Sequence, residues 1–460
     1  MGNEKRPLLT KTNGYGIKLL VVGIVLLMFV PPIAMVHNLV GERSRRNSEA
    51  AEEVISSWGG RLQISSPMLV LPYYYHVYTE DADGESVKTR IDRDLIIFPT
   101  ELDLEMTAPV ETRFRGIYRV PVYTADIKGT GTFRLADAVK SLPDGAVTEP
   151  DKACVGIELS SLKGLRSISP LSWNGTRLDF EPGVLPLEIY SGHIKAPVKI
   201  RSMNETAAFA FEYSFNGGGL IEHIPLAQNT ILNMSSSWAS PSFYGEFLPA
   251  ARSITDNGFQ ARWDISYLSR NLPGYFTAGE VDPYRFFDTA FGVRFIEPVS
   301  AYTLNERSVK YAWLFLLVPF ITLFLFEVLQ NTRIHPVQYL LAGAADVVFY
   351  LLLLSLSEHI SFNGAYLTAA AAVTLLLALY TGQILNRKKN SYSMGLILGA
   401  AYLYLFVVLQ SEDYALLYGS VGLFITLSAV MFTTRHVKWY GGGEKQRGIK
   451  TELSGDPPLI

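Results

Sequence analysis

The sequence predicts a membrane protein of the α+β class. We expect an N-terminal anchor helix, an exported β-rich domain of antiparallel, sandwich-like sheets, and a C-terminal bundle of five transmembrane helices. The composition gives the first indication, because 48% of the 460 residues are hydrophobic and only 18% are charged, against about 25% charged in soluble proteins. Apolar residues also gather into six windows near the two ends of the chain. The long segment between them shows the period-two alternation of β-strands.

The six apolar windows are each close to the ~20 residues that cross a bilayer. They cover residues 17–36, 309–329, 336–357, 362–385, 393–410 and 414–434. The first window follows basic residues, as a secretory signal does, but its apolar run is too long and no A-x-A cleavage site follows. It is therefore expected to be an uncleaved anchor. Pro31 and Pro32 should kink or end its helix, because proline has no backbone amide donor.

Charge in the short loops predicts the orientation in the membrane. The basic loops all lie on one side if both termini are cytoplasmic; their residues are Lys5, Arg6, Lys11, Lys18, Arg333, Arg387, Lys388, Lys389, Arg435, Lys438, Lys445 and Arg447. The alternate loops carry Glu358, and Glu412 with Asp413. Residues 1–16 and 435–460 are then cytoplasmic, and the segment 41–307 is periplasmic. Arg43, Arg45 and Arg46 depart from this rule, but long segments cross the membrane largely regardless of charge.

The exported segment begins with a helix and continues as strands. Residues 41–57 are rich in helix formers and are expected to prolong the anchor as a stalk. Beyond Gly59 and Gly60, β-branched and aromatic residues dominate. Residues 113–122 place Phe114, Tyr118 and Val120 on one face and Arg113, Arg115 and Arg119 on the other, and residues 259–267 alternate in the same way. This pattern indicates antiparallel sheets with one buried face.

Motifs for catalysis are absent from the sequence. It contains no H-E-x-x-H, G-x-x-x-x-G-K-[ST], G-x-S-x-G or C-x-x-C pattern. The single cysteine, Cys154, excludes an intramolecular disulfide and a thiolate zinc site, and a net charge of -3 excludes a polycationic nucleic-acid binder. We therefore expect no enzyme, no cofactor and no metal site. The lipid bilayer is the expected partner, together with an envelope polymer or another envelope protein.

Ionisable residues in the apolar windows are the first candidate site. Asp346 lies mid-membrane, where an acid costs several kcal/mol unless it is protonated or paired. Glu358 and His359, at the outer end of the same window, form a possible proton-handling pair, and Glu327 lies near the inner end of the preceding window. The plainer alternatives are a protonated Asp346 bonded to a Thr or Tyr, and a polar helix end. A nucleophile pair of Ser357 with His359 is disfavoured, because positions two apart on a helix point apart.

Aromatic residues of the exported segment are the second candidate. The stretch "SSSWASPSFYGEFLP" contains Trp238, Phe243, Tyr244 and Phe247, which could contact a glycan, a peptide or the membrane surface. The alternative is a packed loop that covers a sheet end. The arginines of residues 113–119 could likewise bind an anionic polymer or simply form a solvated strand face.

Several stretches resemble the CreD family of bacterial inner-membrane proteins. The most specific is "RIHPVQYLLAGAADVVFYLLLLSLSEHISFNGAYLTAA", and "RFRGIYRVPVY", "WASPSFYGEFLP", "GFQARWDISYLSRNLP" and "VLQSEDYALLYGS" are also similar. The resemblance implies one anchor, a large exported domain and a helical bundle, with roles in envelope integrity, colicin tolerance and the β-lactam response of the CreBC regulon. It implies no catalytic residue, and it covers neither the basic N-terminus nor the tail from Gly441. It assigns no role to Asp346.

The combined expectation is a non-enzymatic protein of envelope integrity and envelope stress response. Its exported domain would sense or bind an envelope component. The alternative is a transporter or lipid-handling protein, in which Asp346, Glu327, Glu358 and His359 would act within the bundle.

Overall fold

The computed structural model describes residues 14–80, 86–295, 301–330, 332–411 and 414–435. Most of the predicted cytoplasmic termini, and Glu412 and Asp413, lie outside these ranges. The described chain forms two compact units, a helical unit of residues 1–44 and 299–460 and a sheet unit of residues 45–298. The predicted fold class is confirmed, with an N-terminal apolar helix, a β-rich domain and a C-terminal helical bundle.

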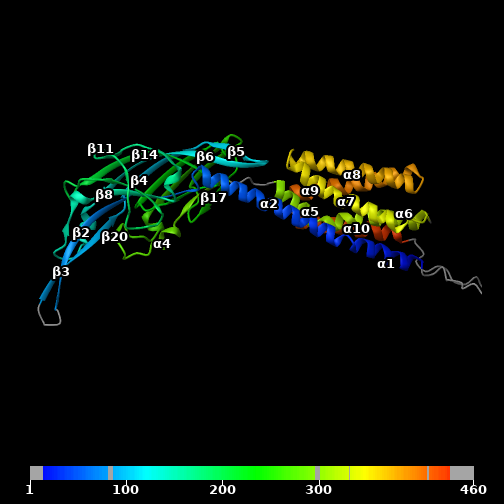
Figure 1. Cartoon of the computed structure of the whole chain (residues 1–460), viewed down its shortest axis with the longest axis horizontal. Coiled ribbons are helices and arrows are strands. Elements are labelled where there is room, and N and C mark those ends of the chain that lie inside the picture. The colour runs from blue at the N-terminus through cyan, green and yellow to red at the C-terminus, as the bar shows by residue number, and fades with distance from the viewer. Residues whose placement is uncertain (1–13, 81–85, 296–300, 331, 412–413, 436–460) are drawn as a thin grey trace, which may run out of the picture. The chain divides into compact units, whose positions relative to one another are not determined.

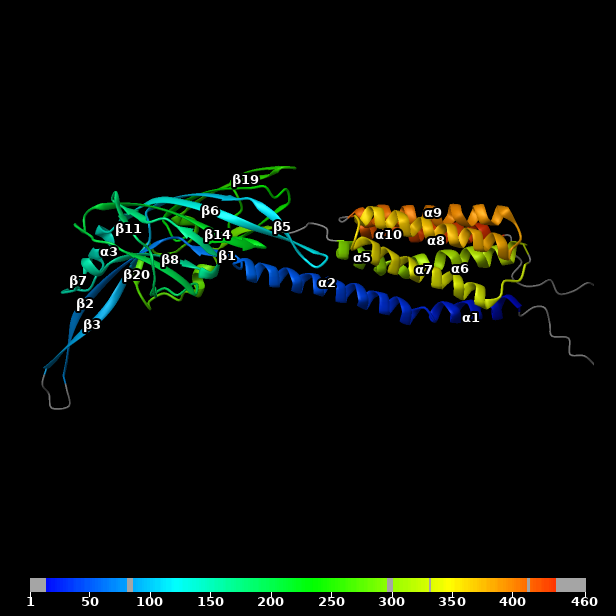
Figure 2. The same cartoon turned by 45° about the horizontal axis from the view of Figure 1, so that its top comes forward.

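Six helices among the described residues are long and apolar enough to cross a membrane. The anchor comprises α1 (Gly14–Leu27) and α2 (Val30–Trp58), and the bundle comprises α6 (Ala312–Gln330), α7 (Pro336–Ser357), α8 (Phe362–Ile384), α9 (Lys388–Gln410) and α10 (Ala415–Thr434). Figures 1 and 2 both show α6 to α9 side by side. The apolar part of α10, residues 417–434, buries none of its residues, as a lipid-facing helix can.

The anchor helix is interrupted at Met28 and Phe29, directly before the two prolines. Pro31 and Pro32 occupy the first turn of α2, where a missing amide donor costs no hydrogen bond. The predicted stalk is confirmed, since α2 continues to Trp58. Gly59 and Gly60 follow with positive φ angles, and a Cβ atom on Gly59 would collide with the Asn216 carbonyl. Glycine therefore ends this helix.

An amphipathic helix that the sequence analysis did not separate precedes the bundle. It is α5 (Ala301–Lys310), whose buried residues include Tyr302, Asn305 and Ser308. Contacts with α7 and α9 assign it to the helical unit. The division between the units therefore lies at residue 299, whereas the predicted exported segment ran to residue 307.

The first sheet of the sheet unit, sheet A, has eleven described strands. In order they are β17 (Pro241–Gly245), β21 (Phe291–Phe295), β15 (Leu220–Ile224), β1 (Leu62–Ser65), β8 (Cys154–Leu159), β2 (Met68–Glu80), β3 (Ser86–Ile97) and β20 (Tyr275–Thr277), with β13 (Gly192–Pro197) on β8, β12 (Glu181–Pro182) on β13 and β7 (Val147–Thr148) on β2.

The second sheet, sheet B, has ten described strands. In order they are β11 (Thr176–Leu178), β10 (Leu171–Trp173), β14 (Thr206–Gly218), β6 (Tyr118–Arg134), β4 (Glu101–Ala108), β16 (Asn229–Ser236), β19 (Gly258–Ser266) and β18 (Ala251–Thr255), with β5 (Val110–Arg115) on β6 and β9 (Leu165–Ile168) on β14. Short helices connect them: α3 (Ala136–Lys140), α4 (Tyr284–Phe287) and the 3₁₀ turns Pro150–Lys152, Leu162–Gly164 and Tyr267–Ser269.

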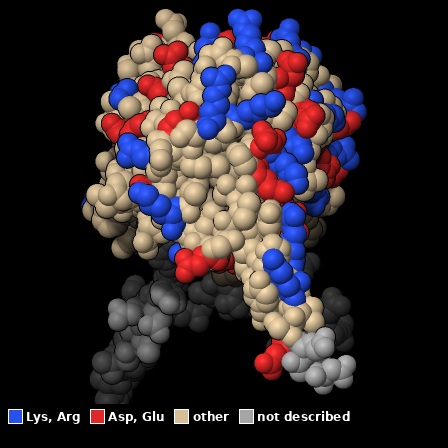
Figure 3. Space-filling view, turned by 90° about the vertical axis from the view of Figure 1, so that its left-hand side faces the viewer, with Lys and Arg blue, Asp and Glu red and all other residues tan. Residues whose placement is uncertain are grey.

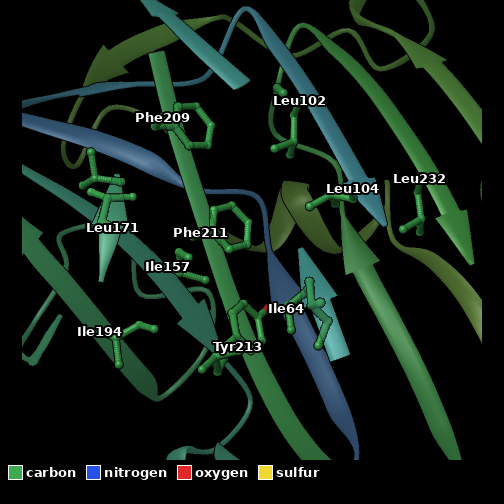
Figure 4. Close-up of a cluster of buried hydrophobic side chains, with 14 of the residues drawn as sticks. Ile64, Leu102, Leu104, Ile157, Leu171, Ile194, Phe209, Phe211, Tyr213 and Leu232 are labelled. Atoms are coloured by element: carbon green, nitrogen blue, oxygen red, sulfur yellow. The ribbon is translucent and has the colours of Figure 1, made fainter. Parts of the chain in front are cut away.

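Both sheets are mixed rather than purely antiparallel. Among the described strands, β1 pairs with β15 in parallel and β16 pairs with β4 in parallel, while the other pairs are antiparallel. The main core lies between the two sheets. In Figure 4, Phe209, Phe211 and Tyr213 of β14 lie in the same cluster as Ile64 and Ile157 of sheet A. Alternation along each strand therefore supplies one apolar face to a shared core.

The arginine-rich segment is a hairpin and not one alternating strand. Gly116, with φ +61°, turns the chain, and Arg113 then pairs with Val120 while Phe114 pairs with Arg119. The predicted row of three arginines on one face is therefore wrong. Arg113 stacks on the ring of Trp58 at 3.6 Å and Arg115 forms an ion pair with Glu53, so both side chains contact the end of α2.

Candidate functional site

A row of buried polar side chains follows one face of α7. Tyr339, Asp346, Tyr350 and Ser357 are all at most 8% exposed. Their spacing of seven, four and seven residues keeps them within about 40° on the helix and extends over about 27 Å, nearly the thickness of the hydrocarbon layer. We call these four residues the α7 polar row. It is the candidate site of the helical unit.

The end of the row at Tyr339 contains an ion pair. Lys18 of α1 lies 2.6 Å from one oxygen of Glu327 in α6, and the Tyr339 hydroxyl donates to the other oxygen at 3.0 Å. Lys18 also donates to the carbonyl of Ile334 at 2.5 Å. The Glu327 carboxylate thus has a charged partner at one oxygen and a hydroxyl partner at the other, and these contacts link α1, α6 and α7.

Asp346 lies at the middle of the row. Its Oδ1 atom accepts a hydrogen bond of 3.0 Å from the hydroxyl of Tyr402 in α9. Its Oδ2 atom and the Tyr350 hydroxyl are buried without a hydrogen-bond partner among the described residues. Tyr366 of α8 in turn donates to the Tyr402 carbonyl at 2.7 Å. The structure thus supplies the tyrosine partner that the plainer interpretation of Asp346 required.

Polar groups meet again at the Ser357 end, where Asn305 donates to Ser357 at 2.8 Å. Ser357 donates to the Leu354 carbonyl. The Tyr302 hydroxyl lies 3.3 Å from Glu358, and Arg43 lies 3.8 Å from the same oxygen. The hydrogen-bond partners of the Ser357 hydroxyl are therefore Asn305 and Leu354, and not His359.

His359 itself is exposed. The structure does not unite the four predicted polar residues in one site. Twelve positions on α7 separate Asp346 from Glu358, which is about 18 Å, and buried Leu353 and Leu354 lie between them. Glu327 binds Lys18 and Tyr339 instead. Among the described residues no group of three His, Cys, Asp or Glu could hold a metal ion.

Sequence reasoning missed Tyr339 and Tyr350 of the row and the partners Lys18 and Tyr402. Lys18 was counted only as a charge that sets orientation, although it and Glu327 were predicted to lie near the same membrane surface. Tyr350 follows Asp346 by one helical turn, a spacing that was visible in the sequence. No sequence signal linked Tyr402 to Asp346, because the contact depends on how α7 and α9 pack.

The four aromatic residues of the exported segment pack against the sheet unit. Trp238, Phe243 and Phe247 are half-buried against the main core, and Phe243 meets Trp263 edge to face at 5.7 Å. The Tyr244 hydroxyl donates to Glu222 at 2.8 Å. Burial and the neighbouring Glu222 charge raise the pKa of Tyr244 well above its usual range. The segment therefore contributes edge strand β17 to sheet A and packs its aromatic rings against the main core.

Comparison with known proteins gives the family. A family model described as inner membrane protein CreD matches residues 14–440. The inner membrane protein CreD of Escherichia coli is 31% identical over 444 residues, which cover 95% of this chain and 96% of that protein. The chain belongs to the CreD family. It is a CreD-like inner-membrane protein with several transmembrane helices.

Similar solved structures include an M1 zinc metallopeptidase from Deinococcus radiodurans, with a TM-score of 0.23 and 14% identity over 37% of this chain and 38% of that chain. A two-domain M1 zinc metallopeptidase bound to L-arginine has a TM-score of 0.23 and 13% identity, over 43% of this chain and 42% of that one. The chain thus covers less than half of these structures. Similarities at this TM-score carry no argument about fold or activity.

Proposed function

We propose that this protein maintains the cell envelope without catalysing a reaction. In this proposal both termini lie in the cytoplasm, residues 45–298 lie in the periplasm, and the sheet unit binds an envelope component during envelope stress. The partner is an envelope polymer or a periplasmic or membrane protein.

One observation carries the proposal. Helix α2 is unbroken from Val30, within the apolar anchor, to Trp58, within the sheet unit. Trp58 is fixed there by a hydrogen bond of 3.2 Å to the Tyr123 carbonyl, and Ile55 packs on Val120 and Val122. Helix α2 therefore runs without a break from the apolar anchor into the sheet unit. The basic short loops support a periplasmic position.

Binding by the intact protein tests this function. Full-length protein in nanodiscs would be immobilised and exposed to purified peptidoglycan, lipopolysaccharide and a detergent-solubilised envelope extract. We expect retention of at least one of these above empty nanodiscs of the same lipids. Retention of none would overturn the proposal.

A second candidate, a transporter or lipid-handling protein, is favoured by one observation. Asp346 and Tyr350 each keep a polar atom without a hydrogen-bond partner among the described residues, and such atoms inside a membrane often mark a pathway. The variants Asp346→Asn and Glu358→Gln would be compared in an envelope-stress survival assay. Loss of survival in Asp346→Asn supports this candidate, while normal survival of both variants excludes a proton-coupled route through these carboxyls.

A further inference from the structure

A hollow opens at the margin of the main core of the sheet unit. It has a volume of about 550 Å³, and the residues around it include Tyr73, Tyr75, Arg93, Tyr275, Thr277 and Glu280. We call it the tyrosine hollow. Its volume falls within the roughly 300–1,000 Å³ of small-molecule sites. Neither the α7 polar row nor the aromatic segment at Trp238 contributes to it.

Strand register explains why tyrosines gather there. Leu71, Tyr73 and Tyr75 point to the same face of β2, because side chains alternate along a strand. Leu71 is fully buried and Tyr73 is 3% exposed, while Tyr75 is only half-buried. Along this face of β2, the residues therefore change from leucine to tyrosine at the point where the face becomes partly exposed to solvent. Tyrosine suits a partly exposed position, since its ring can pack against the core while its hydroxyl remains in contact with water.

The two rings on β2 form an ordered platform. Their centroids lie 6.3 Å apart and their planes differ by 20°. The Tyr73 hydroxyl shares a hydrogen bond of 3.1 Å with the Thr277 hydroxyl of β20. This contact holds the buried ring in place before any ligand arrives, which lowers the entropy cost of binding.

Charged groups of both signs lie beside this platform. Arg93 is directly opposite Tyr73 in the β2–β3 pairing. Its side chain is exposed and has no hydrogen-bond or ion-pair partner among the described residues. Glu280 accepts a hydrogen bond of 3.1 Å from the Thr277 amide through one oxygen, so its other oxygen can bind a donor. The opposite charges balance, which favours a neutral ligand over an anion.

We propose that the tyrosine hollow binds a neutral saccharide unit of an envelope glycan. A pyranose ring presents apolar C–H faces, which pack on aromatic rings, and hydroxyls, which bond to guanidinium and carboxylate groups. Figure 3 shows the end of the sheet unit from which the β2–β3 hairpin projects; both charge signs are interspersed there and leave uncharged surface between them. This inference rests on the proposed function and names the ligand class.

Sugar binding by the full-length protein in nanodiscs tests the inference. The probes are the trisaccharides of N-acetylglucosamine and of glucose, titrated calorimetrically, with a Gly-Gly-Ala tripeptide as the comparison. We expect saturable binding of at least one sugar and none of the tripeptide. Tyr75→Ala and Arg93→Ala should each weaken sugar binding about tenfold, as loss of an anchor in a small site does. Tyr75→Phe keeps the ring and should bind within about threefold of the wild type.

Tyr78→Ala is the matched control, because Tyr78 lies on the same strand, points to the opposite face and is 66% exposed. Its sugar affinity should not change, and circular dichroism would establish that all variants are folded. Equal sugar affinity of Tyr75→Ala, Arg93→Ala and the wild type overturns the inference, as does binding of the tripeptide alone. Wild-type protein that retains envelope extract but neither sugar overturns the inference and leaves the proposed function standing. Protein that retains neither sugar nor extract contradicts both.

Discussion

The sheet unit and the helical unit each contain a buried carboxylate, and the two carboxylates differ in how many hydrogen bonds they accept. In the sheet unit, Glu158 is fully buried and accepts hydrogen bonds from the backbone amides of Glu188, Ile189 and Tyr190 at 2.9, 2.7 and 3.2 Å. His193 lies 4.0 Å from it. In the helical unit, Asp346 accepts one hydrogen bond, from the hydroxyl of Tyr402. The backbone amides of a loop can donate hydrogen bonds to a buried carboxylate. The amides of a helix cannot, because they already donate to carbonyls of the same helix.

From this difference we infer that Glu158 mainly stabilises the fold. Burial raises the pKa of Glu158, and the three amides and His193 offset part of that effect. The three hydrogen bonds of the Glu158 carboxylate tie residues 188–190 to β8, so its main effect should be on stability. Asp346 has less to lose and retains an unpaired oxygen. We therefore expect its replacement to affect function more than folding.

The largest effect is expected at Glu158. Glu158→Ala leaves three buried amides without an acceptor and should lower the unfolding free energy of the sheet unit by about 3–5 kcal/mol. Hydrogen-exchange mass spectrometry of the full-length protein would measure this at β8 and at residues 185–190. Glu158→Gln, which keeps one acceptor oxygen, should lose clearly less. Unchanged exchange in Glu158→Ala would show that the amide contacts contribute nothing.

A pH effect should follow from the buried histidine of the same unit. Burial, assisted by the Arg270 charge, lowers the pKa of His223 to about 3. The unfolded imidazole takes up a proton below about pH 6.5 while the folded one does not, so stability should fall as pH drops from 6.5 towards 3. Between pH 6.5 and 5 the loss should be about 1.6 kcal/mol.

Hydrogen exchange at β1 and β15, measured at pH 6.5 and 5 with correction for intrinsic rates, would test this. The raised pKa of Glu158 acts with the opposite sign, because a carboxyl that is easier to protonate in the folded state stabilises it as pH falls. The comparison is therefore with His223→Gln, which lacks the imidazole but keeps Glu158. An equal pH dependence in both proteins would contradict the assignment to His223.

A smaller effect is expected at the middle of the α7 polar row. Tyr402→Phe removes one intramembrane hydrogen bond, and such bonds contribute about 0.6–1.7 kcal/mol. Asp346→Asn should cost less, because its amide oxygen still accepts the Tyr402 hydroxyl. Thermal unfolding in nanodiscs would rank the two variants. A loss in Asp346→Asn as large as in Asp346→Leu would mean that the negative charge itself stabilises the bundle.

The smallest effects belong to the hairpin arginines. Arg115 and Glu53 are both more than half exposed, so Arg115→Ala should change stability by at most about 0.5 kcal/mol. Arg113→Ala also removes the stacking on Trp58 and should cost about 0.5–1 kcal/mol. Chemical denaturation followed by Trp fluorescence would separate them. The reverse order would mean that the ion pair outweighs the stacking.

The helices were well predicted because a lipid solvent demands a long apolar run. The window 336–357 coincides with α7, and 362–385 differs from α8 by one residue. Helix α9 begins at Lys388, five residues before its window, since its first turn is polar. Asn390 in that turn exchanges two amide hydrogen bonds with Gln330, at 2.8 and 2.9 Å. Hydropathy cannot register such a pair.

Strand faces were predictable within a single strand such as β19, but not across the turn at Gly116, and strand neighbours were not predictable. The alternation of residues 259–265 matches the buried face of β19. The parallel partner of β1 is β15, some 160 residues away. The periodicity of the sequence does not predict which strand pairs with β1. At the candidate sites, the cost of an acid in lipid identified Asp346 and Glu327. Their partners Tyr402 and Lys18 come from other helices, whose packing the sequence pattern does not specify.

The central claim is that a tethered sheet unit lies on the outer side of the membrane. Single cysteines in a Cys154→Ser background test it most directly, with Ser253→Cys on exposed β18 and Lys389→Cys at the start of α9. In intact spheroplasts a membrane-impermeant maleimide should label Ser253→Cys at once and Lys389→Cys only after permeabilisation. Labelling of Ser253→Cys only after permeabilisation would contradict the account.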